Sequence, residues 1–538
     1  MITELRLENA RIYDEKIWRF PLSSLNILCG TNSAGKSTIL KSLLLLRQNV
    51  LFREATAFGT QGGPRLRFSN NFGDLGNFKS FVSHNDTSRD LHLGVSVRAQ
   101  MAGENYRQLD PLAQTNGVID PETDEVIEET QPYFLDADFW FGVKPLIAID
   151  AQAELKQSQL QLDELEEDNA AEHRAVLKRA EFAIRSIDGQ ALSTFQIVRR
   201  LVENKIGVSE YFLRMSKTLL DASAELRRIQ YIPDIHTDFG LIKAVLSGLY
   251  PDRLQGKGQA EEVPTSEESS VRFWPVASYM DEAFGDLRIA MNRIVYLGPL
   301  RAPAKRYYPI QSDANLQNDV TGEFLPNLLR ERINTPVFSA KPVSHAAGRV
   351  RLAEALNSWL YFLRTGDPEP ISPFEREIKV ESMQDVLVEL GIRSAGGTET
   401  HALADSGFGY SQLLPILVRG LMLPTTGTLI VEQPELHLNP ALQVRLADFL
   451  VAMAALGKQI IVETHSEHIV NAIRAISAEK DELESSTRCT VLYLEAVAGR
   501  PQLHKLSMLS DGTVPDWPPS FFGEAAQLYG RILRAKRR

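Results

Sequence analysis

Residues 30–38 spell GTNSAGKST, and this stretch decides the fold. It matches G-x-x-x-x-G-K-[ST], with a strand-like run, LNILCG, before it and a helix-like run, KSTILKSLLLLRQN, after it. Glycines let the backbone N–H groups face phosphate oxygens, and the start of the helix adds a positive end. We expect Lys36 to reach nucleotide phosphates and Ser37 to bind Mg²⁺. The expected nucleotide-binding residues are Gly30, Thr31, Asn32, Ser33, Ala34, Gly35, Lys36, Ser37 and Thr38.

A second apolar run, TLIVE at 428–432, ends in an acid. P-loop proteins carry a metal-binding acid at the end of such a strand, so we expect Glu432 to bind Mg²⁺ together with Ser37. The next residue is Gln433, and Glu435 follows it closely. An amide can orient a water molecule but cannot act as a general base. The catalytic candidates at this strand are Glu432, Gln433 and Glu435.

A third buried strand is predicted within KQIIVETHS at 458–466, and His465 follows it. We expect His465 to contact the γ-phosphate and to orient water. His465 and His468 would also suit a metal pair, but the sequence offers no third ligand of matching spacing. Between the two strands, NPALQVRLADFLVAMAALG predicts a helix, with Pro440 in its first turn and Gly457 past its end.

A glycine-serine stretch, ADSGFGYSQLLPILVRG at 404–420, leads into an apolar helix. Such a helix start presents backbone N–H groups and a hydroxyl to an anion. Alone, the pattern favours a plain capped helix, but its place just before the Glu432 strand favours a nucleotide contact. The candidate contacts are Gly409, Ser411 and Gln412.

Composition limits the class of protein. The chain of 538 residues has 58 basic and 69 acidic residues and a net charge of -11, which argues against a wholly basic nucleic-acid surface. The two cysteines cannot build a disulfide framework or a zinc cluster. The N-terminus does not have the pattern of a signal peptide, and the longest apolar run is far shorter than the ~20 residues of a membrane span. We expect a cytoplasmic protein without a membrane partner.

The order of these motifs resembles the ATP-binding-cassette (ABC) heads of SMC and Rad50 proteins, and more closely the ABC-like ATPases of the overcoming-lysogenization-defect (OLD) group. GTNSAGKST, DSGFGYSQLLPIL, IVEQPELHLNPALQ and IVETHSEHIV carry the resemblance. VYLGPLRAP (295–303) and SDGTVPDWPPSFFGE (510–524) are similar to a subgroup that includes Septu-type ATPase subunits of bacterial anti-phage systems, which act beside an HNH nuclease. The resemblance covers roughly residues 1–100 and 290–525.

The resemblance implies an α/β fold, an ABC-type P-loop ATPase head with a mixed sheet and flanking helices. Residues 1–100 and 291–500 would form the head. Residues 145–290, rich in helix formers, are predicted to be a helical insertion with a mobile loop at 252–270. Residues 501–538 would form a small C-terminal domain.

The resemblance also implies a homodimer, or a higher even-numbered oligomer, that binds ATP and Mg²⁺. Each ATP would lie between 30–38 of one subunit and 407–412 of the other, and 438–440 would form the dimer-crossing loop. Gln48 or a residue of NFGDLGNF (71–78) would be the metal-coupling residue. Some relatives carry a fused toprim nuclease; we expect none here, because only about 70 residues follow His465 in this sequence. We therefore expect an HNH-type nuclease from the same operon as partner, with nucleic acid reached through it.

Gln433 leaves three explanations open, because ABC heads usually carry a catalytic glutamate there. The glutamine is natural and turnover is slow, with help from Glu435 or His465. Alternatively, it is an engineered change that traps ATP, or the chain is a nucleotide switch with negligible hydrolysis. Three functions stay open in parallel: the ATPase subunit of a defence complex, a DNA-repair ATPase, and an ATP-dependent scaffold.

Overall fold

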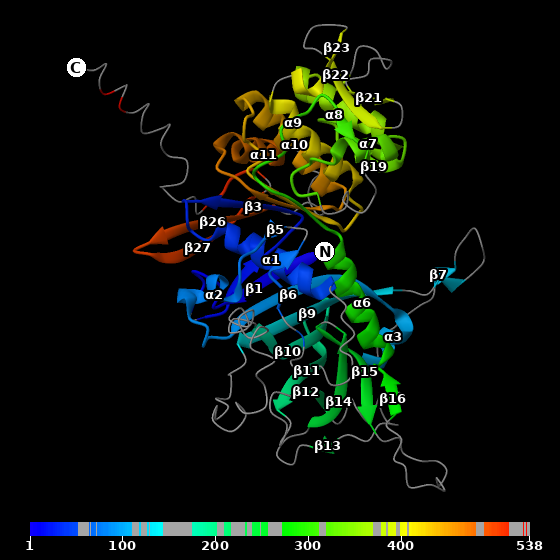
Figure 1. Cartoon of the computed structure of the whole chain (residues 1–538), viewed down its shortest axis with the longest axis vertical. Coiled ribbons are helices and arrows are strands. Elements are labelled where there is room, and N and C mark those ends of the chain that lie inside the picture. The colour runs from blue at the N-terminus through cyan, green and yellow to red at the C-terminus, as the bar shows by residue number, and fades with distance from the viewer. Residues whose placement is uncertain are drawn as a thin grey trace, which may run out of the picture. The chain divides into compact units, whose positions relative to one another are not determined.

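A computed structural model gives the fold of the chain (Figure 1). It describes residues 1–14, 16–51, 64, 66–70, 73–109, 118–119, 126–127, 130–143, 175–201, 209–216, 232–233, 239–247, 249–256, 272–310, 319–369, 378–383, 386–393, 399–405, 408–479, 489–509, 511–515, 531 and 534. The chain divides into two compact units. The first holds Met1–Phe20, Thr38–Asn70 and Asp74–Asn292, and the second holds Pro21–Ser37, Asn71–Gly73 and Arg293–Arg538.

The first unit is built on a large sheet with the order β16-β15-β14-β12-β11-β10-β9-β6-β1-β2, in which β13 also pairs with β14. Neighbouring strands from β1 to β16 run antiparallel. Helix α6 packs against β6 and α3. The strands are β1 Ile2–Glu8, β2 Trp18–Pro21, β6 Leu91–Ala102, β9 Thr130–Val143, β10 Ala175–Ser186, β11 Ala191–Leu201, β12 Ser209–Ser216, β13 Ile232–Pro233, β14 Phe239–Ser247, β15 Tyr250–Gly256 and β16 Arg272–Pro275.

Short elements complete this part of the chain. Two small strand pairs, β4 with β5 and β7 with β8, stand apart from the large sheet. The helix α1 begins at Lys36, directly after the P-loop. These elements are α1 Lys36–Leu51, β4 Ser69–Asn70, β5 Gly73–Asp74, α2 Phe78–Phe81, the 3-10 turn η1 Ser83–Asn85, α3 Gly103–Leu109, β7 Val118–Ile119, β8 Val126–Ile127 and α6 Ser278–Asn292.

The prediction of a helical insertion at 145–290 is wrong for most of the residues that the structure describes there. Strands β10 to β16 occupy this range, and α6 is the described helix at its end. In β10, buried Ala180, Phe182 and Ile184 alternate with more exposed neighbours, a period of two. Burial of that face overrides the helix propensity of the alanines and charged residues. Residues 145–174 and most of the expected mobile loop, 257–270, lie outside the described residues, while 252–256 belong to β15.

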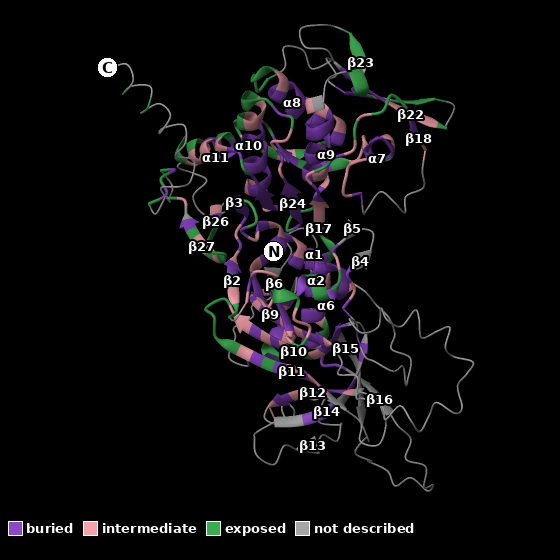
Figure 2. Ribbon diagram, turned by 60° about the vertical axis from the view of Figure 1, so that its left-hand side comes forward, coloured by how far each residue is buried: buried purple, intermediate pink, exposed green. Residues whose placement is uncertain are grey.

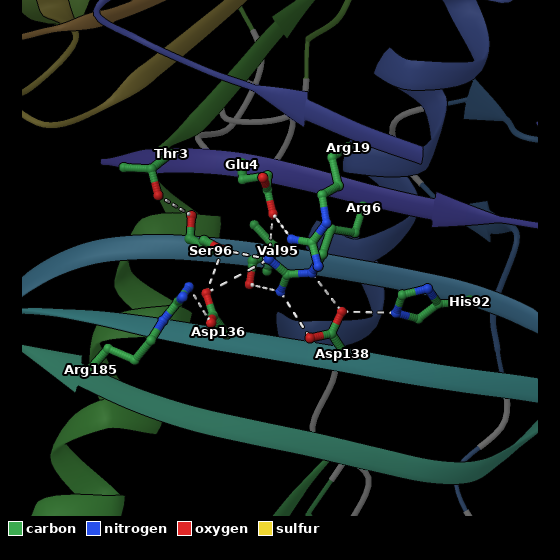
Figure 3. A network of polar contacts seen from close by, with 10 residues as sticks. All are labelled: Thr3, Glu4, Arg6, Arg19, His92, Val95, Ser96, Asp136, Asp138 and Arg185. Atoms are coloured by element: carbon green, nitrogen blue, oxygen red, sulfur yellow. Dashed lines mark hydrogen bonds and ion pairs between the residues drawn. The ribbon is translucent and has the colours of Figure 1, made fainter. Parts of the chain in front are cut away.

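A charged network lies on one face of the large sheet (Figure 3). Arg6 of β1 binds both carboxylate oxygens of Asp138 on β9, at 2.7 and 2.9 Å, and His92 of β6 contacts the same carboxylate at 2.8 Å. Gly94 leaves room for this pairing, because a Cβ there would lie 2.0 Å from Oδ1 of Asp138. Burial acts to raise the pKa of Asp138, but the bonds from His92 and Arg6 outweigh it and lower the pKa. The network ties three strands together by side chains.

The second unit is built on a six-stranded sheet with the order β17-β24-β25-β3-β26-β27. Strands β17 to β26 run parallel, and β27 closes the edge as an antiparallel hairpin with β26. The mixed α/β fold was predicted from the sequence. The strands are β3 Leu25–Gly30, β17 Ile294–Leu297, β24 Thr428–Glu432, β25 Gln459–Glu463, β26 Cys489–Val497 and β27 Arg500–Ser507.

Helices pack against this sheet, and their apolar side chains form the hydrophobic core of the second unit together with those of the strands. Helix α10 packs against β3, β25, α8, α9 and α11. Strands β24 and β25 are buried along their whole length, and β24 can be found by its label in Figure 2. The remaining elements are β18 Tyr308–Pro309, α7 Leu325–Arg332, β19 Pro336–Ala340, β20 Ala347–Arg351, α8 Leu352–Thr365, β21 Ile378–Met383, β22 Leu387–Arg393, β23 Thr400–Ala402, the 3-10 turn η5 Leu403–Asp405, α9 Phe408–Met422, α10 Pro440–Ala455 and α11 Glu467–Glu479.

The helix predicted between the two strands is confirmed as α10. Asn439 caps its start by accepting from the Leu442 amide at 3.0 Å, and Pro440 occupies the first turn. Gly457 follows its end with a left-handed φ of 77°. The expected small domain at 501–538 begins inside β27, so its first residues belong to the six-stranded sheet. Among the described helices, none is both long enough and apolar enough to cross a membrane.

Candidate nucleotide site

The P-loop follows β3 and is shaped by three residues with left-handed backbone angles. φ is 130° at Gly30, 61° at Ser33 and 98° at Gly35. At Gly30 the chain also passes close to β26, since a Cβ there would lie 1.8 Å from the carbonyl oxygen of Leu494. The Thr31 amide donates to that oxygen at 3.0 Å. Glycine alone fits this position, and the tip of the loop, 31–33, is exposed.

Lys36 begins α1 and reaches back over the loop. Its side chain is buried, and Nζ donates to the carbonyl oxygens of Gly30 at 3.1 Å and Thr31 at 2.8 Å. Burial lowers the pKa of Lys36, and the charge of Glu463 opposes that shift. An ammonium group has three donors, so these two bonds leave one for a phosphate oxygen. That Lys36 binds nucleotide phosphates stays a prediction.

Ser37 faces a carboxylate that the sequence did not single out. Its Oγ lies 3.4 Å from both carboxylate oxygens of Glu463, the last residue of β25. Glu463 is 4% exposed. Burial, together with the charge of Glu432, raises the pKa of Glu463 to about 7, while Lys36 and Ser37 act in the opposite direction. The surroundings of Glu463 thus disfavour a negative charge that no cation balances.

Glu432 and Glu463 end neighbouring parallel strands and are register partners. Glu432 is buried, and Oε1 accepts a hydrogen bond from the Tyr296 hydroxyl at 2.9 Å. Tyr296 belongs to β17, on the other side of β24. Burial and the neighbouring Glu432 raise the pKa of Tyr296, so the phenol stays a donor. The sheet therefore gathers two carboxylates at one edge.

Gln433 is held by its backbone on two sides. Its amide donates to the Glu463 carbonyl oxygen at 2.7 Å, and its carbonyl oxygen accepts from Arg301 at 3.3 Å. Arg301 also donates to the Glu432 carbonyl oxygen at 2.7 Å. Burial lowers the pKa of Arg301 to about 10. Gln433 has a left-handed φ of 44°, which costs a non-glycine residue roughly 1 kcal/mol or more.

Glu435 and His465, two of the catalytic candidates, are brought together. Oε1 of Glu435 accepts from the His465 amide at 2.7 Å, and Oε2 accepts from the Thr464 hydroxyl at 2.8 Å. The His465 side chain is exposed. Partial burial and the charge of Lys36 lower the pKa of His465, and Glu435 opposes this. The imidazole is thus mostly neutral at physiological pH, when one ring nitrogen can accept a hydrogen bond.

Gly409 and Ser411 of the glycine-serine stretch lie in the first turn of α9, which begins at Phe408. Gly409 lies beside the loop after β24, where an added Cβ would be 3.6 Å from the His437 carbonyl oxygen and 3.7 Å from a Leu438 side-chain carbon. Ser411 and Gln412 are both buried within the single chain. Ser411 also helps to line a small cavity with Tyr308, Leu403 and Pro415. Residue 407 of the expected contact lies outside the described residues.

The structure also bears on the expected metal-coupling residue and on possible metal clusters. Gln48, a candidate for metal coupling, is buried and donates from Nε2 to the Arg67 carbonyl oxygen at 2.9 Å. Within the described residues, no group of three or more histidine, cysteine, aspartate or glutamate side chains is arranged to hold a metal ion. Mg²⁺ held with a nucleotide uses only one or two carboxylates together with phosphate oxygens.

Sequence reasoning missed Glu463, Tyr296 and Arg301. Glu463 lies in the stretch that pointed to His465, and Tyr296 and Arg301 lie in the stretch VYLGPLRAP, which pointed to a family resemblance. A strand that ends in glutamate beside another strand that ends in glutamate was a usable signal, because parallel neighbours bring their last residues to one edge. The roles of Tyr296 and Arg301 depend on the pairing of β17 with β24, which spans more than a hundred residues of sequence and leaves no local pattern.

One family of known sequences matches part of the chain. Residues 251–471 match the family described as "AAA domain, putative AbiEii toxin, Type IV TA system". Over these residues the chain is similar to ABC-like P-loop ATPases. The matched stretch contains α9, Glu432 and His465 but not the P-loop at 30–38. The P-loop and the family match are therefore separate observations. The match covers less than half of the chain. No curated protein matches the chain.

Solved SMC heads are among the structures that align with the chain. The SmcHead bound to the C-winged helix domain of ScpA gives a TM-score of 0.37 and 12% identity, covering 94% of this chain and 98% of that chain. The Smc head with an extended coiled coil, bound to the C-terminal domain of ScpA derived from Pyrococcus furiosus, gives 0.33 and 11%, covering 100% and 99%. The SMC head from Thermotoga maritima gives 0.32 and 10%, covering 94% and 98%. These TM-scores are too low to establish a shared fold.

Proposed function

We propose that the chain binds ATP with Mg²⁺ and hydrolyses it slowly. The observation that carries this proposal is the meeting of three elements at one sheet edge. The start of α1, where the P-loop ends, supplies Lys36 and Ser37, and the ends of β24 and β25 supply Glu432 and Glu463. The family match over 251–471 supports the same activity independently of the P-loop.

The residues at this edge fit Mg²⁺. The ion prefers oxygen ligands, and the Ser37 hydroxyl and the buried Glu432 carboxylate provide them. Tyr296 occupies one oxygen of Glu432, and Ser37 and Glu432 would hold the ion together with ATP phosphates. When bound, Mg²⁺ neutralises phosphate charge and so favours the attack of water on the terminal phosphate.

Slow hydrolysis follows from the side chains near the expected attacking water. Gln433 can orient this water by hydrogen bonds but cannot take its proton. Glu435 and His465 are the remaining acceptors, and the contact of Glu435 with the His465 amide makes them one structural unit. We propose that this unit sustains a low rate and that the chain works mainly as an ATP-held switch.

The switch that we propose is a homodimer closed by ATP. The P-loop of one copy would meet the first turn of α9 in a second copy, with Gly409, Ser411 and Gln412 near the γ-phosphate. Ser411 and Gln412 are buried in the single chain, so this contact requires the first turn of α9 to be approached through its backbone or to open slightly. Leu438, the first residue of the proposed dimer-crossing segment 438–440, lies beside Gly409, which suits a role in crossing between copies.

The output that we propose is control of a partner effector in anti-phage defence. The description of the matched family names a putative toxin of a type IV toxin–antitoxin system. This supports a role in a defence system. The finer assignment, a Septu-type subunit with an HNH nuclease, rests on the resemblance of VYLGPLRAP (295–303) and SDGTVPDWPPSFFGE (510–524). Nucleic acid would be reached through the nuclease.

Co-purification tests the defence assignment. The tagged chain would be expressed with its operon neighbours, purified with and without MgATP, and measured by native mass spectrometry. We expect an even-numbered oligomer that retains a nuclease subunit and changes composition with ATP in the wild type but not in Lys36→Ala. A lone chain that recruits no neighbour in either state would contradict the assignment.

A further inference from the structure

Glu463 occupies a position between the two halves of the nucleotide site. It is the last residue of β25, and β25 lies between β24, which ends in Glu432, and β3, which leads into the P-loop. In register, Glu463 is opposite Glu432 on one side and Leu28 on the other. A side chain at this point can therefore meet both the metal-binding acid and the start of α1.

The contacts of Glu463 single it out further. Both carboxylate oxygens lie 3.4 Å from Ser37 Oγ, so the carboxylate straddles the hydroxyl instead of forming one short hydrogen bond. Among the residues that the structure describes, no lysine or arginine forms an ion pair with Glu463. Oxygens bound side by side to one octahedral Mg²⁺ lie roughly 3 Å apart, because each metal–oxygen bond is about 2.1 Å. A movement of a few tenths of an ångström would bring Ser37 and Glu463 to that spacing.

Charge explains why a cation belongs here. Glu463 is buried beside Glu432, near Glu435, and Lys36 already donates to loop carbonyls. A buried carboxylate without an ion-pair partner is costly, and a triphosphate brought next to it adds repulsion. A divalent cation removes both penalties. A glutamate kept only for packing would not need to face the hydroxyl that binds the metal.

We propose that Glu463 is a third protein group of the Mg²⁺ site, acting with Ser37 and Glu432 to hold the ion beside ATP. The inference rests on the proposed ATP-binding function. It assigns Glu463 a role toward the metal and leaves the water-orienting residues unchanged. The consequence is a stronger dependence of ATP binding on Mg²⁺ than Ser37 and Glu432 alone would give.

The test compares ATP affinity with Mg²⁺ and with EDTA by calorimetry, using a non-hydrolysable ATP analogue. The variants are Glu463→Gln, Glu463→Asp and the control Glu495→Gln, whose carboxylate pairs with His504 on the same sheet. In Glu463→Gln we expect the gain in affinity from Mg²⁺ to fall on the order of tenfold. Affinity in EDTA should stay equal or improve, because an amide does not repel phosphates. Glu463→Asp should retain part of the gain, and Glu495→Gln all of it.

A second readout is metal binding without activity. Mn²⁺ titration followed by electron paramagnetic resonance, in the presence of the same analogue, should show weaker Mn²⁺ binding in Glu463→Gln. An unchanged gain from Mg²⁺ would overturn the inference while ATP binding stands. Equal loss of affinity with Mg²⁺ and with EDTA would also overturn it, since that marks a structural role. Wild-type protein that binds no nucleotide would overturn both proposals.

Discussion

The His465 amide donates a hydrogen bond to Oε1 of Glu435 at 2.7 Å. The second oxygen of the same carboxylate accepts from Thr464 at 2.8 Å. Glu435 follows β24 and His465 follows β25, so one carboxylate fixes the relation between two loops at the candidate nucleotide site. The backbone of His465 therefore depends on Glu435.

Loss of either member should slow ATP turnover. We expect Glu435→Ala and His465→Ala each to lower kcat at least tenfold, because both side chains act on the expected attacking water. The double variant should have about the same kcat as the slower of the two single variants, since the residues act as a unit. Steady-state phosphate release measures this. Unchanged rates in both single variants would exclude the pair from hydrolysis.

A glutamate at position 433 should speed hydrolysis. Gln433→Glu supplies a carboxylate that can accept a proton, and general-base catalysis is typically worth about 10²–10⁴-fold in rate. Gln433→Ala is the matched control, since both variants keep a side chain at the left-handed φ of 44°. We expect the glutamate to raise kcat at least tenfold and the alanine to lower it. A glutamate variant as slow as the wild type would show that the amide is not the brake.

Gly30 should tolerate no side chain. In Gly30→Ala the new Cβ would lie 1.8 Å from the Leu494 carbonyl oxygen, so β3 and β26 must separate. The alanine would also have to adopt a φ of 130°. We expect a loss of more than about 3 kcal/mol in the free energy of unfolding. Gly499→Ala is the control: its φ is 77° but no atom lies within 4 Å of the new Cβ, so about 1 kcal/mol is expected. Urea unfolding measures both, and equal losses would contradict the close approach.

Lys458 should make stability depend on pH in the alkaline range. It is 1% exposed, and burial lowers its pKa to about 8. The unfolded lysine keeps its proton up to roughly pH 10.4, so between these values the unfolded chain binds more protons and the free energy of unfolding rises with pH. Three carbonyl contacts, the shortest to Gly420 at 2.9 Å, favour the ammonium and reduce the effect.

The contribution of Lys458 to this change in the free energy of unfolding is at most about 3 kcal/mol. Urea unfolding at pH 7.5 and pH 10 should show wild-type protein gaining stability relative to Lys458→Met, which lacks the ionisable group. Parallel changes in the two proteins would place the lysine charge outside the pH dependence.

The second unit could be predicted largely from local patterns. The strands that end in Gly30, Glu432 and Glu463 are short apolar runs, and Asn439, Pro440 and Gly457 mark the limits of α10. These features need no knowledge of the tertiary contacts, because buried parallel strands and helix caps leave signals within a few residues.

The first unit and part of the site could not be predicted in this way. In β10, alanine, lysine, arginine and glutamate favour a helix, yet the alternating burial of Ala180, Phe182 and Ile184 on the sheet decides the outcome. Tyr296 and Arg301 reach the nucleotide site only because β17 pairs with β24. Contacts between distant segments leave no periodic signal in one sequence.

Calorimetric binding of MgATP to wild-type protein and to Lys36→Ala tests the central claim most directly. Lys41→Ala, one turn further along α1, serves as the matched control. The structure predicts that Lys36→Ala weakens binding by about 100-fold, or roughly 2.7 kcal/mol, while Lys41→Ala binds like the wild type. Equal affinity of wild type and Lys36→Ala, or no binding by the wild type, would contradict an ATP site at the P-loop.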